Sequence, residues 1–326
     1  MRVPPSEAAV VILNWNGAGE TANALDSLIR SGLPASRLIV VDNGSSGDDV
    51  RVLRARYPAI KMISLRNNHG FARAVNIGAA AALRDGARYI VLFNNDAWIE
   101  PGVAVIPTLI DALAADPTLG AVGPLIVETD GDGAARIQSA GYRYSLLFPI
   151  ARGQFAGARA DGERRYRAVT CLSGSCLAVS AEAFRRVGGL DEDFFLYGDD
   201  VDFALRLRTA GYAERLVPQV RVFHRRAASN GIASSRHIYT GLRSTLILLK
   251  KHGRWYHLPS ATLTLIAAAI ALTALNARAG RVDGAGASLR AFRDFLAGRW
   301  GGYEGSWAPE PLFSELEPLR FGIPAA

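Results

Sequence analysis

Cysteine is scarce in this sequence of 326 residues, which contains only Cys171 and Cys176. Their spacing is too long for a CxxC redox pair, and no second Cys/His pair is present to complete a zinc site. We therefore expect two reduced, half-buried thiols that take no part in redox or zinc chemistry.

The sequence also lacks a long apolar run at its amino terminus and a dinucleotide-binding glycine motif. The opening stretch MRVPPSEAAVVILNWNG contains a short apolar run that ends at Asn14, whereas a secretory signal needs a longer one with a cleavage site. NWNGAG stands where a dinucleotide oxidoreductase would have GxGxxG. We expect a cytoplasmic protein that is not such an oxidoreductase.

Hydrophobic residues make up 49% of the chain, and its formal net charge is +7. This length and composition suffice for one large domain, or one domain with an appendage. The positive charge favours anionic partners such as nucleotide diphosphates, phospholipid surfaces or nucleic acid. We expect no nucleic-acid binding, because there is no recognisable reading motif and the basic residues cluster beside an apolar run.

Apolar, β-rich runs alternate with helical patterns from residue 8 to about residue 93. The expected strands are AVVILNW, RLIVVDNGSS, IKMISLRNN and RYIVLFNND, separated by GETANALDSLIRSG, DDVRVLRARYP and FARAVNIGAAAALRDG. This alternation predicts an α/β fold with a mostly parallel sheet flanked by helices. The four strands end in polar residues at 14–16, 42–46, 66–69 and 94–96. Ligands of open α/β sheets bind at the carboxyl ends of strands, so we expect these residues to share one ligand-binding edge.

Two carboxylates of this edge are candidate ligand contacts. Asp96, after Asn94 and Asn95, suits Mg²⁺ or Mn²⁺ whose open positions take diphosphate oxygens, although such a cluster also suits a turn. Asp42 suits a hydrogen bond to a base or ribose, and an Asx turn that caps the next helix is the alternative.

A second acidic group lies further along the chain, in YGDDVDFALRLRTAGY. One acid is enough to cap the predicted helix, whereas Asp199, Asp200 and Asp202 repel one another within four residues. This surplus suggests a nearby cation, substrate hydroxyl or basic partner. A carboxylate facing an acceptor hydroxyl can act as general base.

His224 ends the run VPQVRVFH and is followed by Arg225 and Arg226. A lone histidine is usually a structural hydrogen-bonding residue, but imidazole is also a common metal ligand. The adjacent arginines can neutralise a departing diphosphate.

The last hundred residues differ in composition from the rest. RHIYTGLRSTLILLKKHGRWYH is basic and amphipathic, and residues 258–277 carry no charged side chain. We predict a catalytic domain at residues 1–230 and a helical, membrane-associating appendage at 231–326, with an interfacial helix that faces anionic headgroups. The alternative is a helical appendage that packs on the catalytic domain or forms a homodimer interface.

Six elements, taken in this order, resemble the family-two inverting glycosyltransferases of GT-A fold, in particular the rhamnosyltransferase-like branch. These elements are VVILNWNG, VVDNGSS, NNHGFARAVNIG, LFNNDAWIEPG, VGGLDEDFFLYGDDVDFALRLRTAGY and FHRRAAS. The resemblance implies a Rossmann-like GT-A domain that moves a sugar, rhamnose as a first guess, from a dTDP- or UDP-linked donor. The implied acceptor is a hydroxyl of a glycan or polyprenyl-linked acceptor in cell-surface polysaccharide synthesis, at the inner membrane face. The alternative is a non-catalytic nucleotide-sugar-binding or scaffolding protein of the same fold.

The resemblance also implies roles for individual residues. Asp96 matches the metal-binding last acid of the family's DxD motif, His224 resembles the histidine that completes the Mg²⁺ or Mn²⁺ shell, and Asp200 matches the general base. Asp42 would lie near the nucleobase. The other implied donor-binding residues are Asn14, Asn16, Asn68, Asn94, Asn95 and Arg225. Two positions depart from the family pattern: Asn94 replaces the first acid of DxD, and Asp199 stands where Glu is commoner. Asp199 is therefore the alternative candidate for the catalytic base.

Overall fold

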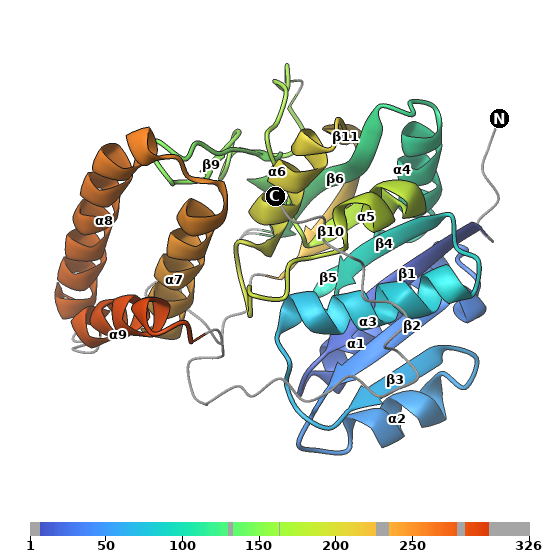
Figure 1. Ribbon diagram of the computed structural model, residues 1–326. Coiled ribbons are helices and arrows are strands. Elements are labelled where there is room, and N and C mark those ends of the chain that lie inside the picture. The colour runs from blue at the N-terminus through green and yellow to red at the C-terminus, as the bar shows by residue number, and fades with distance from the viewer. Residues whose placement is uncertain (1–6, 130–132, 163, 226–234, 279–283, 300–326) are drawn as a thin grey trace.

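The computed structural model describes residues 7–129, 133–162, 164–225, 235–278 and 284–299 (Figure 1). Its helices are α1 Ala18–Arg30, α2 Asp49–Arg56, α3 Phe71–Arg84, α4 Val105–Ala114, α5 Ala181–Val187, α6 Asp199–Thr209, α7 Ser235–His252, α8 Leu258–Arg278 and α9 Gly284–Leu296, with short 3-10 turns at Ala35–Arg37 and Trp255–His257. Its strands are β1 Ala8–Asn14, β2 Leu38–Asn43, β3 Lys61–Leu65, β4 Tyr89–Asn94, β5 Ala97–Trp98, β6 Leu119–Thr129, β7 Ala135–Ser139, β8 Tyr142–Arg143, β9 Arg152–Gly153, β10 Cys176–Ser180 and β11 Ala213–His224.

One large sheet forms the centre of the fold, in the order β3-β2-β1-β4-β10-β6-β11-β5, with β7 paired to β6. The first four strands of this order are parallel, as the alternating sequence pattern predicts. β10 lies antiparallel between β4 and β6, while β6 and β11 are again parallel. The predicted α/β fold is therefore confirmed, and the antiparallel direction of β10 is a feature that the alternating sequence pattern does not indicate.

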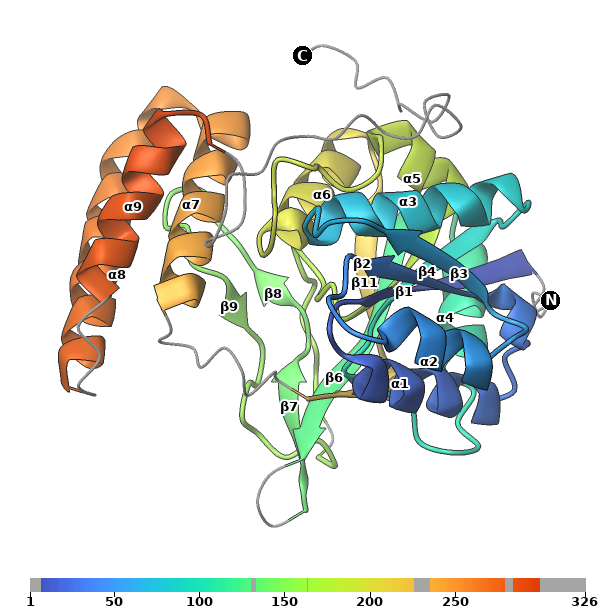
Figure 2. The same ribbon diagram turned by 90° about the horizontal axis from the view of Figure 1, so that it is seen from below.

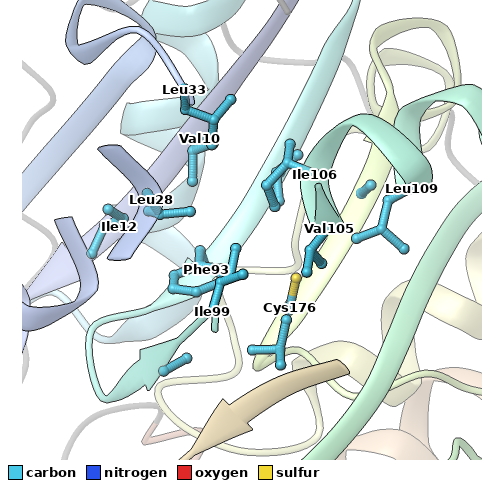
Figure 3. Packing of buried hydrophobic residues seen from close by; sticks show 14 of the residues in the cluster. Val10, Ile12, Leu28, Leu33, Phe93, Ile99, Val105, Ile106, Leu109 and Cys176 are labelled. Carbon is cyan, nitrogen blue, oxygen red and sulfur yellow. The ribbon is translucent and has the colours of Figure 1, made fainter. Parts of the chain in front are cut away.

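Both faces of the sheet are buried. Because successive side chains of a strand point to opposite faces, neighbouring residues of β1 belong to two different core clusters. Val10 and Ile12 of β1 pack on one face with Leu28 of α1 and residues of α4 (Figure 3). Ala9 and Val11 pack on the other face in a cluster that includes α3, α5 and α6.

The two cysteines are fully buried, with 1% of Cys171 and none of Cys176 exposed, so the expectation of half-buried thiols was wrong. Both are free thiols. Burial raises the pKa of each thiol above its usual value, because a thiolate would lose its solvation. They are structural residues of the core.

Helices α7, α8 and α9 form a group beside the sheet domain (Figures 1 and 2). α7 joins this group to the rest through Ile247 and Leu248, which pack with Phe194 and Val201. Among the described helices, none combines the length and the hydropathy needed to cross a bilayer.

Helix α3 packs against the sheet at Gly78, where there is no room for a side chain. A Cβ at this position would overlap Val11 of β1 and lie 2.9 Å from Val41 Cγ2 of β2. All residues of α3 from 72 to 83 are buried, so the helix has little freedom to move away. The approach of α3 to β1 and β2 therefore depends on the missing side chain.

We predict that Gly78→Ala lowers the free energy of unfolding by about 1–3 kcal/mol through overpacking. Gly19→Ala in α1 is the matched control, because a Cβ at Gly19 meets no atom within 4 Å. That control should change stability by less than about 0.5 kcal/mol or increase it slightly. Urea unfolding measures both values, and equal stability of the two variants would show that α3 is not held this closely.

Candidate active site

The carboxyl ends of β1 and β2 are joined through the side chain of Asn14, which has no exposed surface. Asn14 Nδ2 donates to Asp42 Oδ1 at 2.7 Å and to Asp49 Oδ2 at 3.0 Å. Asn14 Oδ1 accepts from Thr21 Oγ1 at 2.6 Å. The amide thus connects β1, β2 and the first turns of α1 and α2.

Asp42 is 2% exposed, and its two oxygens accept hydrogen bonds within the protein. Besides Asn14, the backbone N–H of Ser45 donates to Oδ2 at 3.1 Å and Ser45 Oγ donates to Oδ1 at 2.5 Å. Asp42 thus holds the loop after β2 through Ser45, but it does not cap the next helix, because the N-cap residue of α2 is Asp48. Asn16, by contrast, is exposed with a φ of 50°, and its Oδ1 accepts from the backbone N–H of Ser46 at 2.8 Å.

Asn68 lies beyond the end of β3 and is half-buried. Its Oδ1 accepts from Asn43 Nδ2 at 3.0 Å and from the backbone N–H of Gly70 at 2.9 Å. Gly70 lies directly before α3, so Asn68 connects the end of β2 with the start of α3. The three neighbouring parallel strands thus end in one hydrogen-bonded edge.

Asp96 and His224 meet at the end of β4, although 128 positions separate them in the sequence. His224 Nε2 lies 3.0 Å from Asp96 Oδ1 and 3.2 Å from Asn94 Nδ2. The pairing of β11 with β5 places His224 beside Ala97, directly after Asp96. The predicted association of these three residues is therefore present in the structure.

The orientation of His224 is suited to metal binding. Gln138 Nε2 donates to Glu128 Oε2 at 3.2 Å. This bond directs the other end of the Gln138 amide, the carbonyl oxygen Oε1, towards His224 Nδ1 at 2.6 Å. Nδ1 then carries the proton, and in the neutral ring Nε2 presents a lone pair to Asp96 Oδ1. Two acceptors 3.0 Å apart need a cation or a proton between them.

The donor set fits a divalent cation that also binds a ligand. The described part of the chain contains no group of three or more His, Cys, Asp or Glu side chains suited to metal binding. Asp96 and His224 supply one oxygen and one nitrogen ligand, and a Mg²⁺ ion usually takes its remaining ligands from substrate phosphates and water.

Asp199 and Asp200 begin α6 and differ in exposure. Asp199 is 6% exposed, and burial, followed by the charge of Asp200, raises its pKa to about 8. Asp200 is half-buried, and burial raises its pKa although the backbone N–H groups of Val201 and Gly174 donate to it. Burial therefore disfavours ionisation of both carboxyl groups, and Asp200 is the more accessible of the two.

A continuous series of contacts connects the carboxylates of this edge. Asn95 Nδ2 donates to Thr21 Oγ1 at 3.3 Å, and Thr21 in turn contacts Asn14. The backbone N–H of Asn94 donates to the carbonyl oxygen of Ser175 at 3.0 Å, next to Gly174, which donates to Asp200. Asp42, Asp96 and Asp200 are thereby linked through short side chains and one loop.

Arg225 is exposed, and its backbone N–H donates to the carbonyl oxygen of Asp96 at 2.9 Å. Arg226, the second arginine after His224, lies outside the described residues. A separate surface depression, lined by residues that include Arg88, Tyr89 and Arg185, lies at the opposite, amino-terminal edge of β4 and is not part of this site.

The structure adds residues to this edge that the sequence did not reveal. Gln138 orients His224 from β7, a strand with no recognisable motif, and no local pattern connects the two residues. Ser45 and Asp49 could have been found, because a polar cluster after a strand and an acid at a helix start are familiar signals. The donor-side network is therefore denser than predicted.

Two solved structures resemble this fold. One is GalNAc-T7 with UDP, GalNAc and Mn²⁺, with a TM-score of 0.54 and 17% identity, over 74% of this chain and 47% of the other. The second is the mannosyltransferase PcManGT from Pyrobaculum calidifontis in complex with GDP-Man and Mn²⁺, with a TM-score of 0.50 and 19% identity, over 89% of this chain and 87% of the other. The predicted GT-A fold is confirmed by these likenesses.

Sequence comparison gives the family. The model of glycosyl transferase family 2 matches residues 9–188, and that of glycosyl transferase family group 2 matches residues 137–278. N-acetylglucosaminyl-diphospho-decaprenol L-rhamnosyltransferase of Mycobacterium tuberculosis is 33% identical over 68% of this chain and 77% of the relative. The dTDP-rhamnosyl transferase RfbF of Shigella flexneri is 24% identical over 67% of this chain and 69% of the relative. This chain therefore belongs to glycosyl transferase family 2, in its rhamnosyltransferase-like branch, as predicted.

We predict that Gln138→Leu weakens Mn²⁺ binding about 10- to 100-fold, because His224 loses the acceptor that fixes its ring. Gln219→Leu is the matched control, since Gln219 is exposed on β11. Isothermal titration of Mn²⁺ in the presence of dTDP measures the affinity, and thermal unfolding checks that both variants are folded. Equal affinity of the two variants would exclude this role of Gln138.

Proposed function

We propose that this glycosyltransferase is metal-dependent and inverting, and that it transfers rhamnose from dTDP-rhamnose to a hydroxyl of a lipid-linked glycan in cell-surface polysaccharide synthesis. The observation that carries this proposal is the pairing of Asp96 with His224 on the edge that also presents Asp200. The names of two relatives, a decaprenol-linked L-rhamnosyltransferase and a dTDP-rhamnosyl transferase, support this choice of donor and acceptor.

The donor would lie along the carboxyl ends of β1, β2 and β4. Asn14 and Asp42 are buried, so they would support the nucleotide site by holding the strand ends, with Asp42 nearest the base. The more accessible residues of this edge are Asn16, Asn68, Asn94 and Asn95.

Asp96 and His224 would hold Mg²⁺ or Mn²⁺. Such an ion supplies positive charge against the leaving diphosphate. The exposed guanidinium group of Arg225, which follows His224, would add a second positive charge at the same place. Asn94 contributes no charge, so Asp96 supplies the negative charge of the Asn94-Asn95-Asp96 stretch to the cation.

Asp200 would remove the proton from the acceptor hydroxyl, whose oxygen then attacks the anomeric carbon opposite the diphosphate. Attack from that face inverts the configuration of the sugar. The raised pKa of Asp200 makes it a stronger base than an exposed carboxylate. Asp199 is 6% exposed whereas Asp200 is only half-buried, so we assign the proton transfer to Asp200.

We predict that Asp200→Asn lowers kcat for transfer on the order of 100- to 10,000-fold, because the amide cannot accept the proton. Binding of dTDP should change little, since Asp200 lies on the acceptor side. Asp161→Asn is the control, as Asp161 is exposed and pairs with the exposed Arg159. Transfer rates and dTDP affinity are compared in the same preparation.

Three outcomes of that experiment are informative. Near-normal turnover by Asp200→Asn would place the base elsewhere. Loss of both turnover and dTDP binding would show that Asp200 is needed for the fold of the site. A wild-type protein that binds dTDP-rhamnose without transfer or hydrolysis would support the non-catalytic binding protein instead.

We further propose that the C-terminal region, residues 231–326, attaches the enzyme to an anionic membrane from the cytoplasmic side. α8 packs on α7 through Ala261 and Leu265. Its exposed residues include Leu263, Ile266 and Ile270, which are 70%, 50% and 65% exposed and repeat at intervals of three and four. Such spacing places them on one face of the helix.

α9 repeats this arrangement. It packs on α7 through Ala287 and Ala291, whereas Leu289, Phe292 and Leu296 are 72%, 41% and 79% exposed at the same intervals. Trp255, 82% exposed between α7 and α8, has the amphipathic ring that favours membrane interfaces. We call these six exposed apolar residues of α8 and α9 the apolar face. The exposed basic residues Lys250 and Arg254 lie close to it in sequence.

We predict that Ile266→Asp with Ile270→Asp weakens binding to vesicles of phosphatidylglycerol and phosphatidylethanolamine by at least about tenfold. Val52→Asp, at a similarly exposed residue of α2, should bind vesicles as the wild type does. Cosedimentation measures binding, and analytical ultracentrifugation measures the oligomeric state. Unchanged vesicle binding would reject the membrane proposal, and a wild-type dimer that the double variant dissociates would assign the apolar face to a homodimer.

A further inference from the structure

Helix α7 lies along the active-site edge and contacts it near its amino-terminal end. The guanidinium carbon of Arg236 lies 5.6 Å from the centroid of the Trp15 ring, which follows β1 and is 41% exposed. The ring of His237 lies 4.9 Å from that of Tyr197, shortly before Asp199. This end of α7 therefore touches both the donor edge and the segment that leads to α6.

The middle and the end of α7 contact the same segment, residues 190–198. Ser244 Oγ donates to the carbonyl oxygen of Leu196 at 3.2 Å, and a Cβ on Gly198 would lie 3.1 Å from Ser244 Cβ. Lys251 Nζ lies 2.6 Å from a carboxylate oxygen of both Asp191 and Asp193. The segment is thus held along much of its length by one helix.

The last residue of α7 reaches into α6 itself. His252 Nε2 lies 2.7 Å from Asp202 Oδ1, and Arg206 Nε donates to Asp202 Oδ2 at 2.7 Å. Asp202 has no exposed surface and lies in the first turn of α6, two residues after Asp200. A buried carboxylate needs such partners, so the direction of this first turn depends on His252 and Arg206.

Helix α3 holds residues 190–198 from the other side. The backbone N–H of Phe71 donates to the carbonyl oxygen of Phe195 at 2.7 Å, and Asn76 Nδ2 donates to that of Leu190 at 2.8 Å. The segment therefore lies between α3, whose amino end belongs to the donor edge, and α7. A shift of α7 would change the position of Asp200 relative to the donor.

We propose that α7 is a positioning element of the active site, and that His252, acting through Asp202, sets the position of Asp200 against the donor. This inference rests on the proposed role of Asp200 as the base. The sequence predicts that the catalytic domain ends at residue 230. In this proposal α7, which lies after that boundary, contributes to the active site as well. His252 is a positioning residue, because no substrate atom needs to touch it.

The test compares His252→Leu, His252→Gln and His257→Leu in the full-length enzyme. His252→Leu should lower kcat with dTDP-rhamnose on the order of 100-fold, because a displacement of the base by about 1 Å has an effect of this size. The KM for the donor should stay unchanged within about twofold. His252→Gln retains an N–H donor for Asp202 and should restore most of kcat. His257 bonds locally to the backbone N–H of Arg254, so His257→Leu should behave as the wild type.

Hydrogen exchange of residues 191–202 gives a second measurement that needs no donor. Exchange should be faster in His252→Leu than in the other two variants. Unchanged kcat and exchange in His252→Leu, or equal losses in the Leu and Gln variants, would overturn the proposal.

If His252→Leu does not fold, Lys251→Gln takes its place. Faster exchange at residues 191–193 together with a lower kcat would support the proposal, and unchanged values would reject it. A wild-type enzyme inactive with dTDP-rhamnose would refute the proposed donor, while the exchange results still decide the role of α7.

Discussion

The buried side-chain amide of Asn14 is the interaction on which the arrangement of the site depends. It has no exposed surface, and it connects the end of β1 with Asp42 of β2, Asp49 of α2 and Thr21 of α1. Hydrogen bonds to charged groups contribute about 1.5–3 kcal/mol each, and an unpaired buried amide would cost a similar amount. The strand ends therefore have one low-energy arrangement, which fixes the geometry of the donor edge before any ligand arrives.

The catalytic half of the site is held by different means. β10 enters antiparallel beside β4, and the loop before it contacts both Asn94 and Asp200. α3 and α7 then hold residues 190–198 from two sides. In the proposed function, separate elements would therefore position the nucleotide, the cation held by Asp96 and His224, and the base Asp200.

The sequence predicted the parallel strands well, because each apolar run is short and ends in turn-forming polar residues. It also placed Asp96, Asn94 and His224 together, but only through resemblance, since 128 positions separate Asp96 from His224 and no periodicity links them. Gln138 and His252 could not be found in this way. Each acts through one long-range hydrogen bond, and their positions depend on how β7 and α7 pack, which local residue patterns do not encode.

The most direct test of the account is a crystal structure of the enzyme with Mn²⁺ and dTDP. We predict an ion bound by Asp96 and His224, with diphosphate oxygens completing its coordination and the nucleoside along the ends of β1 and β2, so that Asp200 lies across the open side of the diphosphate. A nucleotide bound away from this edge, or an ion that neither Asp96 nor His224 contacts, would contradict it.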